Sequence, residues 1–257
     1  MGNDYFRFKQ FEVRQANSAM RVNTDGVLLG AWSFLFIGDT SPVLRMLDVG
    51  TGTGVMALML AQRFPQGRID AVEIDEASCQ DAALNFANSP WSNRLTLYNQ
   101  DFNTFQPYSG ATYHCIISNP PFFVNSLQSD NVAKMQVRHC SLLSHHSLLV
   151  HSASLLNPLG LLAIIIPATA EKEVLSEAVS AGFTVYRRCV VYGKEGGRPL
   201  RVMLELCLQR KGGVSYNVQD LFFGDLGNFP QQSEIVLTTA DGKRNPLYAE
   251  LTTDFYL

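Results

Sequence analysis

The sequence predicts an α/β protein whose central sheet is mostly parallel and is covered by helices on both faces. From Arg45 onward, short β-rich runs alternate with amphipathic helical stretches, a pattern typical of parallel strands joined by crossover helices. The last two strands are joined by a loop, Gly193–Leu200, that is too short for a helical crossover, so they should pair antiparallel. Among 257 residues, 46% are hydrophobic and 17% charged, which fits a folded globular chain.

The first half of the predicted sheet follows directly from apolar runs and turn residues. Arg45–Val49 is an apolar strand that ends in a glycine turn, and the next apolar run becomes the second strand. Between the second and third strands, small and aromatic side chains recur on one side of a predicted helix. The elements expected here are strands Arg45–Val49, Arg68–Ile74, Leu95–Asn99 and His114–Ser118, and helices Gly54–Arg63 and Glu76–Asn88.

The second half repeats the alternation after a polar segment. The longest apolar run, Leu159–Ala168, is too short to cross a membrane, and with its glycine and proline it suits a buried strand. The elements expected here are helices Ser144–Leu156 and Ala170–Ala181, and strands Gly160–Pro167, Phe183–Tyr192 and Val202–Gln209. We expect a single domain with an N-terminal extension (1–44), a core sheet (45–210) and a C-terminal extension (211–257) that contains a hairpin turn at Ala240–Lys243.

Composition excludes several classes of protein. The net charge of −3 gives no overall basic character, so affinity for a nucleic acid would depend on local clusters of Lys and Arg. The five cysteines are scattered without a CxxC pair, which indicates reduced thiols. The sequence has neither a signal-peptide pattern nor an apolar run of membrane-spanning length, so we expect a cytoplasmic protein with no membrane contact.

Three alternating glycines follow the first strand. Gly50, Gly52 and Gly54 allow the backbone to turn tightly and to approach a ligand closely. Dinucleotide enzymes use the spacing GxGxxG, whereas this turn has GxGxG with Asp48 just before it. A carboxylate would repel a phosphate, but it suits the ammonium of a methionine tail. The motif therefore favours S-adenosylmethionine over a dinucleotide as the cofactor.

Acidic residues end the next two strands. Glu73 lies about 20 residues beyond the glycine turn, where a carboxylate commonly binds ribose hydroxyls, and Asp75 follows it. Solvated acids at a strand end are the alternative for this pair. At the end of the third strand, Asp101 is expected to accept a hydrogen bond from the adenine amino group, and Phe102 to pack on the adenine ring.

The most informative stretch ends the fourth strand and reads Asn119-Pro120-Pro121-Phe122. Two prolines fix the backbone, so the Asn119 side-chain oxygen and the Pro120 carbonyl can accept both hydrogens of an exocyclic amino group. That arrangement makes the nitrogen lone pair available for in-line attack on a methyl group. Phe122 is expected to stack on the target ring. A plain strand-terminating turn is the alternative, and the preceding motifs disfavour it.

These residues resemble the amino-group methyltransferases that carry an asparagine-proline-proline-aromatic motif. Members act on adenine N6 in DNA or RNA, on guanine N2 in ribosomal RNA, or on glutamine N5 in release factors. The resemblance implies a seven-stranded, mostly parallel, Rossmann-like methyltransferase sheet with the last strand antiparallel. Such chemistry needs no metal, and the histidines His139, His145, His146 and His151 fit no zinc spacing, so no metal is expected.

Both ends of the chain narrow the resemblance. Phe8–Phe11 and Met20–Trp32 are similar to the N-terminal signature of the bacterial tRNA1(Val) adenine-N6 methyltransferases, and Leu251–Leu257 is similar to their C-terminal end. The resemblance implies methylation of a tRNA adenine beside the anticodon, at position 37. It also implies that Thr24 and Asp25 lie over the cofactor. Alternatively, or in addition, Thr24 or Asp25 caps a helix Gly26–Phe36.

Two other functions stay open. Glutamine-N5 enzymes carry a helical domain ahead of the glycine motif, for which the N-terminal 45 residues leave no room, but an amide nitrogen also fits the catalytic motif. The second is a non-catalytic RNA-binding module that retains S-adenosylmethionine. The motif order favours the tRNA enzyme, and no obligate protein partner is evident.

Positive charge concentrates near the last two strands. The candidate RNA contacts are Arg187, Arg188, Lys194, Arg198 and Arg201. Basic residues that protect a solvated strand edge from pairing are an equal alternative for this cluster. The polar segment Asn125–Arg138 is a further candidate, as a loop that orders on substrate binding.

Overall fold

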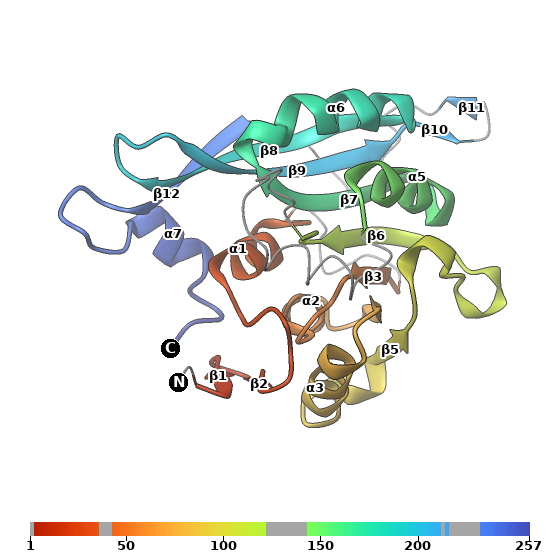
Figure 1. The fold of residues 1–257 in the computed structure, drawn as a ribbon, viewed down its shortest axis with the longest axis horizontal. Coiled ribbons are helices and arrows are strands. Elements are labelled where there is room, and N and C mark those ends of the chain that lie inside the picture. Colours follow the sequence, from red (N-terminus) through yellow and green to blue (C-terminus); the bar gives the residue numbers. More distant parts are fainter. Residues whose placement is uncertain (1–2, 36–42, 122–142, 212–213, 216–231) are drawn as a thin grey trace, which may run out of the picture.

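The computed structural model describes residues 3–35, 43–121, 143–211, 214–215 and 232–257. Within these residues, the centre of the molecule is an eight-stranded sheet in which only β9 runs against the others (Figure 1). Across the sheet the order is β12 (Gln232–Thr238), β8 (Phe183–Lys194), β9 (Pro199–Leu208), β7 (Leu156–Pro167), β6 (Tyr113–Ser118), β3 (Arg45–Val49), β4 (Arg68–Glu73) and β5 (Leu95–Asn99).

The predicted fold class is confirmed, and two details of the sheet are corrected. The described sheet has eight strands, because β12 pairs in parallel with β8 and covers what would otherwise be an open edge. The sequence gives β12 only a weak signal, since the segment has three polar residues followed by three apolar ones and so lacks the alternation of a half-buried strand. The antiparallel strand β9 also lies inside the sheet, between β7 and β8, instead of at its end.

Four predicted helices are present with ends that differ by at most one residue, and the helix expected at Gly26–Phe36 begins two residues earlier and ends at Trp32. The four are α2 (Val55–Arg63), α3 (Glu76–Ala87), α5 (His145–Leu155) and α6 (Glu171–Ser180), and the two extensions add α1 (Thr24–Trp32) and α7 (Pro246–Leu251). Side-chain caps explain two of the starts, because Asp75 and Ser144 accept hydrogen bonds from the first turns of α3 and α5. Across the described residues, no helix combines the length and apolar character that a membrane crossing requires.

Alternation along the strands creates a hydrophobic core on each face of the sheet. Along β7, Leu161, Ala163 and Ile165 face one cluster, which includes residues of α1 and α2. Leu162 and Ile164 face the other cluster, which includes residues of α5 and α6. Helices therefore cover both faces, and the carboxyl ends of the parallel strands are left to form a site.

The two extensions meet at one side of the molecule, where the chain ends lie close together (Figure 1). The N-terminal extension begins with a small hairpin, β1 (Tyr5–Arg7) and β2 (Glu12–Arg14). The Lys9 N–H donates to the Phe255 carbonyl at 2.8 Å. In the C-terminal extension, the predicted turn is confirmed by the hydrogen bond from the Thr239 N–H to the Lys243 carbonyl and by Gly242 with φ of 82°.

Candidate active site

The glycine turn joins β3 to α2 in a conformation that side chains disfavour. Gly50, Gly52 and Gly54 have φ of 67°, 54° and 82°, in the left-handed region that glycine adopts readily. A Cβ on Gly54 would lie 2.5 Å from the ring of Phe86 in α3, whereas none of the described atoms lies within 4 Å of a Cβ built on Gly50 or Gly52. The turn therefore packs tightly against α3 at one end and leaves backbone open to a ligand at the other.

Asp48 lies buried just before this turn. Its Oδ2 accepts hydrogen bonds from the Thr51 hydroxyl at 2.6 Å and from the Ala57 N–H at 3.0 Å. Its Oδ1 is buried and has no hydrogen-bond partner in the described structure. Burial raises the pKa of Asp48 to about 7, although the two hydrogen bonds lower it. A cationic or hydrogen-bond-donating ligand group at Oδ1 would satisfy this carboxylate.

Glu73 joins the end of β4 to the glycine turn. Its Oε2 accepts from the Gly52 N–H at 2.8 Å, and its Oε1 accepts from the Asp75 N–H at 2.9 Å. A carboxylate has further lone pairs, so these bonds leave capacity for ligand hydroxyls. Asp75 itself caps α3, because its Oδ2 accepts from the N–H and hydroxyl of Ser78. Glu73 therefore lies against the turn, and the neighbouring Asp75 serves as the N-cap of α3.

The acid and aromatic pair after β5 also makes local contacts. Asp101 Oδ1 accepts from the N–H and the side-chain amide of Asn103, both at 2.9 Å. Phe102 is buried, and its ring packs edge-on against His151 of α5 at a centroid distance of 4.8 Å. Contact of these two residues with an adenine ring stays a prediction.

Asn119 follows β6 directly and adjoins the first turn of α1. Its Oδ1 is buried without a hydrogen-bond partner in the described structure. Its Nδ2 lies 3.9 Å from the position that a Cβ would take on Gly26. The preceding residue, Ser118, donates its hydroxyl to the Val49 carbonyl at 2.9 Å and pairs with Val49 across β6 and β3. This bond holds the ends of the two strands together, so Asn119 lies at the same edge as the glycine turn.

The rest of the proline motif is partly described. Pro120 is buried and Pro121 is exposed. Phe122, together with the polar segment Asn125–Arg138, lies outside the described residues, so the predicted stacking of Phe122 on a base stays a prediction.

The start of α1 differs from the predicted capping. Asn23 is the N-cap, because its Oδ1 accepts from the Gly26 N–H at 2.9 Å, and the helix begins at Thr24. The alternative that Thr24 or Asp25 caps the helix is therefore wrong. Asp25 forms an ion pair with Arg201, with 2.8 Å between Oδ2 and Nε. Sequence reasoning overlooked Asn23, although asparagine is a preferred N-cap.

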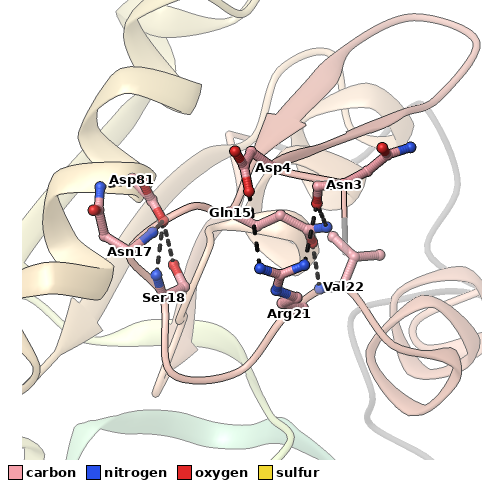
Figure 2. Close-up of polar contacts among 8 residues, drawn as sticks. All are labelled: Asn3, Asp4, Gln15, Asn17, Ser18, Arg21, Val22 and Asp81. Atoms are coloured by element: carbon pink, nitrogen blue, oxygen red, sulfur yellow. Dashed lines mark hydrogen bonds and ion pairs between the residues drawn. The ribbon is translucent and has the colours of Figure 1, made fainter. Parts of the chain in front are cut away.

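The chain that leads into α1 is fastened to α3 by Asp81, as Figure 2 shows. Asp81 is buried and accepts from the backbone N–H groups of Asn17 and Ser18, both at 2.8 Å, and from both of their side chains. Further along, the Gln15 side chain accepts from the Val22 N–H at 2.9 Å. These bonds fix the path of the N-terminal extension across the sheet edge.

Asn85, one helical turn beyond Asp81, contacts the glycine turn itself. Its Nδ2 donates to the Thr53 carbonyl at 2.8 Å and to the Arg14 carbonyl at 2.9 Å, and its Oδ1 accepts from the Arg14 N–H. Sequence reasoning missed Asp81 and Asn85, because their roles depend on partners more than 30 residues away in the chain.

The structure divides the candidate RNA contacts into two groups. Arg187 is buried, pairs with Glu205 at 3.2 Å and lies over the Trp32 ring at 4.3 Å. The prediction of an RNA contact is therefore wrong for Arg187, since its guanidinium belongs to the interior beneath α1. Burial raises the pKa of Glu205 to about 7, although the charge of Arg187 lowers it.

The other candidates lie nearer to solvent. Arg188 pairs with Glu171 of α6 through two hydrogen bonds. Lys194 ends β8 and Arg198 lies in the turn just before β9, and both are exposed. These two are the candidates that remain available for contact with a polyanion.

Together, these residues form a site at the carboxyl ends of β3, β4 and β6. Two buried acceptor oxygens that lack partners in the described structure, Asp48 Oδ1 and Asn119 Oδ1, lie at the ends of neighbouring strands. The adjacent turn leaves its backbone open at Gly50 and Gly52. Such a set can hold a ligand with a cationic tail and a second ligand with an amino group. Open α/β sheets bind ligands at this edge. These acceptor oxygens and the open turn therefore fit S-adenosylmethionine, the cofactor that the sequence predicts.

Comparison with known proteins agrees with the fold and the turn. Residues 39–187 match the family described as the Methyltransferase small domain. A solved structure from Agrobacterium tumefaciens, described as a predicted O-methyltransferase, shares 14% identity and a TM-score of 0.63, and the likeness covers 90% of this chain and 96% of the other. At that identity the likeness shows the fold alone. Fold, site and family match together define a methyltransferase.

Full-length relatives narrow the class. The tRNA1(Val) (adenine(37)-N6)-methyltransferase of Tolumonas auensis is 36% identical over 100% of this chain and 98% of its own length. The protein of the same name from Aeromonas hydrophila is 37% identical over 99% of this chain and 98% of its own length. This chain belongs to the family of tRNA1(Val) (adenine(37)-N6)-methyltransferases.

Proposed function

We propose that this protein transfers a methyl group from S-adenosylmethionine to the N6 amino group of an adenine in tRNA, at position 37 of tRNA1(Val). The observation that carries the proposal is the buried Oδ1 of Asn119, which has no partner in the described structure and lies at the same sheet edge as the glycine turn. The named substrate of the full-length relatives supports the choice of adenine and of tRNA.

The residues around the turn would hold the cofactor. Asp48 would bind the ammonium of the methionine tail through Oδ1, which lacks any other partner. The bare backbone at Gly50 and Gly52 would lie along the ligand, and Glu73 would accept from its ribose hydroxyls. When bound, S-adenosylmethionine supplies a methyl group that is activated by the positive sulfur.

Asn119 and Pro120 would prepare the amino group. The Asn119 Oδ1 and the Pro120 carbonyl accept one N–H each, which orients the nitrogen lone pair toward the methyl group. Methyl transfer to the nitrogen held by Asn119 and Pro120 would leave the electron pair of the broken carbon–sulfur bond on the sulfur of the cofactor. The methylated nitrogen then releases one proton to water. Asn119 and Pro120 would thus accelerate methyl transfer by positioning and hydrogen bonding, and the reaction would need no strong base.

The test measures methyl transfer to tRNA from a strain that lacks the activity, followed by nucleoside analysis. Wild-type protein is expected to produce N6-methyladenosine. Asn119→Ala should lower turnover by about 100- to 1000-fold while the Kd for S-adenosylmethionine changes less than about threefold, because Asp48 and the glycine turn are intact.

Asn93→Ala is the matched control, since Asn93 is exposed in the connection ahead of β5 and should leave both quantities unchanged. Transfer confined to a glutamine of a release factor would overturn the tRNA proposal. Undiminished transfer by Asn119→Ala would overturn the role of Asn119, and absence of transfer to any tRNA would favour a binding module.

A further inference from the structure

Two residues that the sequence assigns to different ligands face each other in the structure. Asp25, expected over the cofactor, and Arg201, expected on RNA, form an ion pair with Nε and Oδ2 2.8 Å apart. Their side chains are only 19% and 23% exposed, respectively, so both are largely withdrawn from solvent. Charges held at this depth interact more strongly than an exposed surface pair.

The pair spans the edge of the sheet where the site lies. Arg201 is near the start of β9, opposite Pro167, the last residue of β7. Its Nη1 also donates to the Leu200 carbonyl at 3.1 Å, which helps to fix the guanidinium. Asp25 is the second residue of α1 and precedes Gly26, which adjoins Asn119. The ion pair thus links the antiparallel strand to the helix turn that borders the catalytic motif.

The first turn of α1 is the part of that helix that needs such a link. From Gly26 to Trp32 every residue is buried, so the helix body is held by packing. Thr24 is exposed and Asp25 is partly buried, so packing holds the first turn less firmly. The Asn23 cap orders the turn internally, and the Arg201 guanidinium ties it to the sheet. The acidic group at a helix N-terminus also suits the helix dipole.

We propose that Arg201 is a positioning residue for methyl transfer: through Asp25 it fixes the first turn of α1 against Asn119. The turn in that place adjoins Asn119 and Val55, the first residue after the glycine turn, so a shift of the turn would misalign the groups that hold the two reactants. This inference rests on the proposed function. It removes Arg201 from the set of RNA contacts and gives Asp25 a role through its partner.

A double-mutant cycle tests the pair. Arg201→Gln and Asp25→Asn should each lower kcat/KM for S-adenosylmethionine by about tenfold, and the double variant should lose no more than about tenfold, because either change alone already breaks the link. Arg201→Lys, which keeps the charge, should recover part of the loss. Unfolding temperatures of all variants should stay close to that of the wild type, since the helix body is packed independently.

Arg68→Gln is the matched control, since Arg68 is an exposed arginine at the amino end of β4, on the far edge of the sheet. A loss of about 100-fold in the double variant, the product of the single losses, would overturn the proposal, because Asp25 and Arg201 would then act separately. So would a reduced salt dependence of tRNA binding in Arg201→Gln, which marks a lost phosphate contact.

The proposed function is tested separately by the wild type. If the wild type methylates no tRNA, the proposed function fails. If it does and the losses multiply, the positioning role alone fails.

Discussion

Asp48 combines complete burial with an unpartnered oxygen, and burial raises its pKa to about 7. An unfolded aspartate ionises near pH 4. Between about pH 4 and pH 7 the folded protein therefore holds a proton that the unfolded chain has released. The stabilisation from the neutral carboxyl is complete below about pH 4 and is lost as the pH rises through about 7.

Replacement of Asp48 by asparagine should reduce this pH dependence. The amide oxygen can still accept from Thr51 and Ala57, so the variant stays folded. Its free energy of unfolding should fall less than that of the wild type as the pH rises from 5 to 7.5, by urea denaturation without ligand. Glu205, whose pKa is also raised to about 7, contributes a fall of the same sign in both proteins. An equal fall in the two proteins would contradict the assignment.

As the pH rises and the stability of the unliganded protein falls, the affinity for the cofactor should increase. The carboxylate that would bind the methionine ammonium is formed only as Asp48 loses its proton, so wild-type affinity should rise from pH 5.5 to about 7. Asp48→Asn should bind about 10-fold more weakly at pH 7.5, the size of a lost charged hydrogen bond, and show a flatter profile. Calorimetric titration measures both, and unchanged affinity in the variant would exclude Asp48 from the site.

The stability of an Arg187 variant tests whether Arg187 is a buried ion-pair partner of Glu205 and not a surface residue that contacts RNA. Arg187→Met leaves the buried Glu205 without its ion-pair partner, which should lower the free energy of unfolding by about 3–5 kcal/mol. Arg198→Met changes an exposed arginine of the same region and should leave stability nearly unchanged. Chemical denaturation at neutral pH measures the free energy of unfolding of both variants. Equal values for the two variants would place Arg187 at the surface.

At the scale of elements, α3 supports the site from behind. Asp81 and Asn85 face the N-terminal extension, and Phe86 packs against Gly54. The helix thereby joins the glycine turn to the segment that leads to α1, and Figure 2 shows its bonds to that segment through Asp81. No local sequence pattern reports such a role, because a buried aspartate and asparagine in a helix look like solvated residues until their distant partners are known.

Removal of the Asp81 carboxylate should destabilise the contact between α3 and the segment that leads to α1. Asp81→Ala leaves two buried or partly buried N–H groups without an acceptor, so the free energy of unfolding should fall by about 2–4 kcal/mol. Asp4→Ala is the control in the same view, because the Asp4–Arg21 pair is exposed and 3.9 Å long, and it should have little effect. Similar losses in both variants would contradict the anchoring role.

Prediction from sequence succeeded where the signal was local. The alternation of apolar strands and helices, the glycine turn and the proline motif lie in continuous segments, and the structure brings Asp48, Glu73 and Asn119 to one edge of the sheet. Prediction failed where tertiary partners decide the outcome. Arg187 reads as a surface arginine until Glu205 and Trp32 are placed beside it.

At the scale of the whole molecule, charge limits how tRNA can bind. The net charge is −3, so attraction for a polyanion must come from local groups such as Lys194 and Arg198 near the β8–β9 turn. Replacement of both by glutamine should weaken tRNA binding and reduce the slope of log K against log salt by about 2, roughly one for each lost phosphate contact. A slope equal to that of the wild type would place the tRNA elsewhere.

The most direct test of the central claim is the position of the methyl group on tRNA1(Val). The tRNA is taken from cells that lack the activity, incubated with the protein and S-adenosylmethionine, and cut into fragments for mass spectrometry. We expect one added methyl group, on N6 of the adenine at position 37, and its formation should be about 100- to 1000-fold slower with Asn119→Ala. A methyl group on another nucleotide or another atom of that adenine, or transfer to protein alone, would contradict the account.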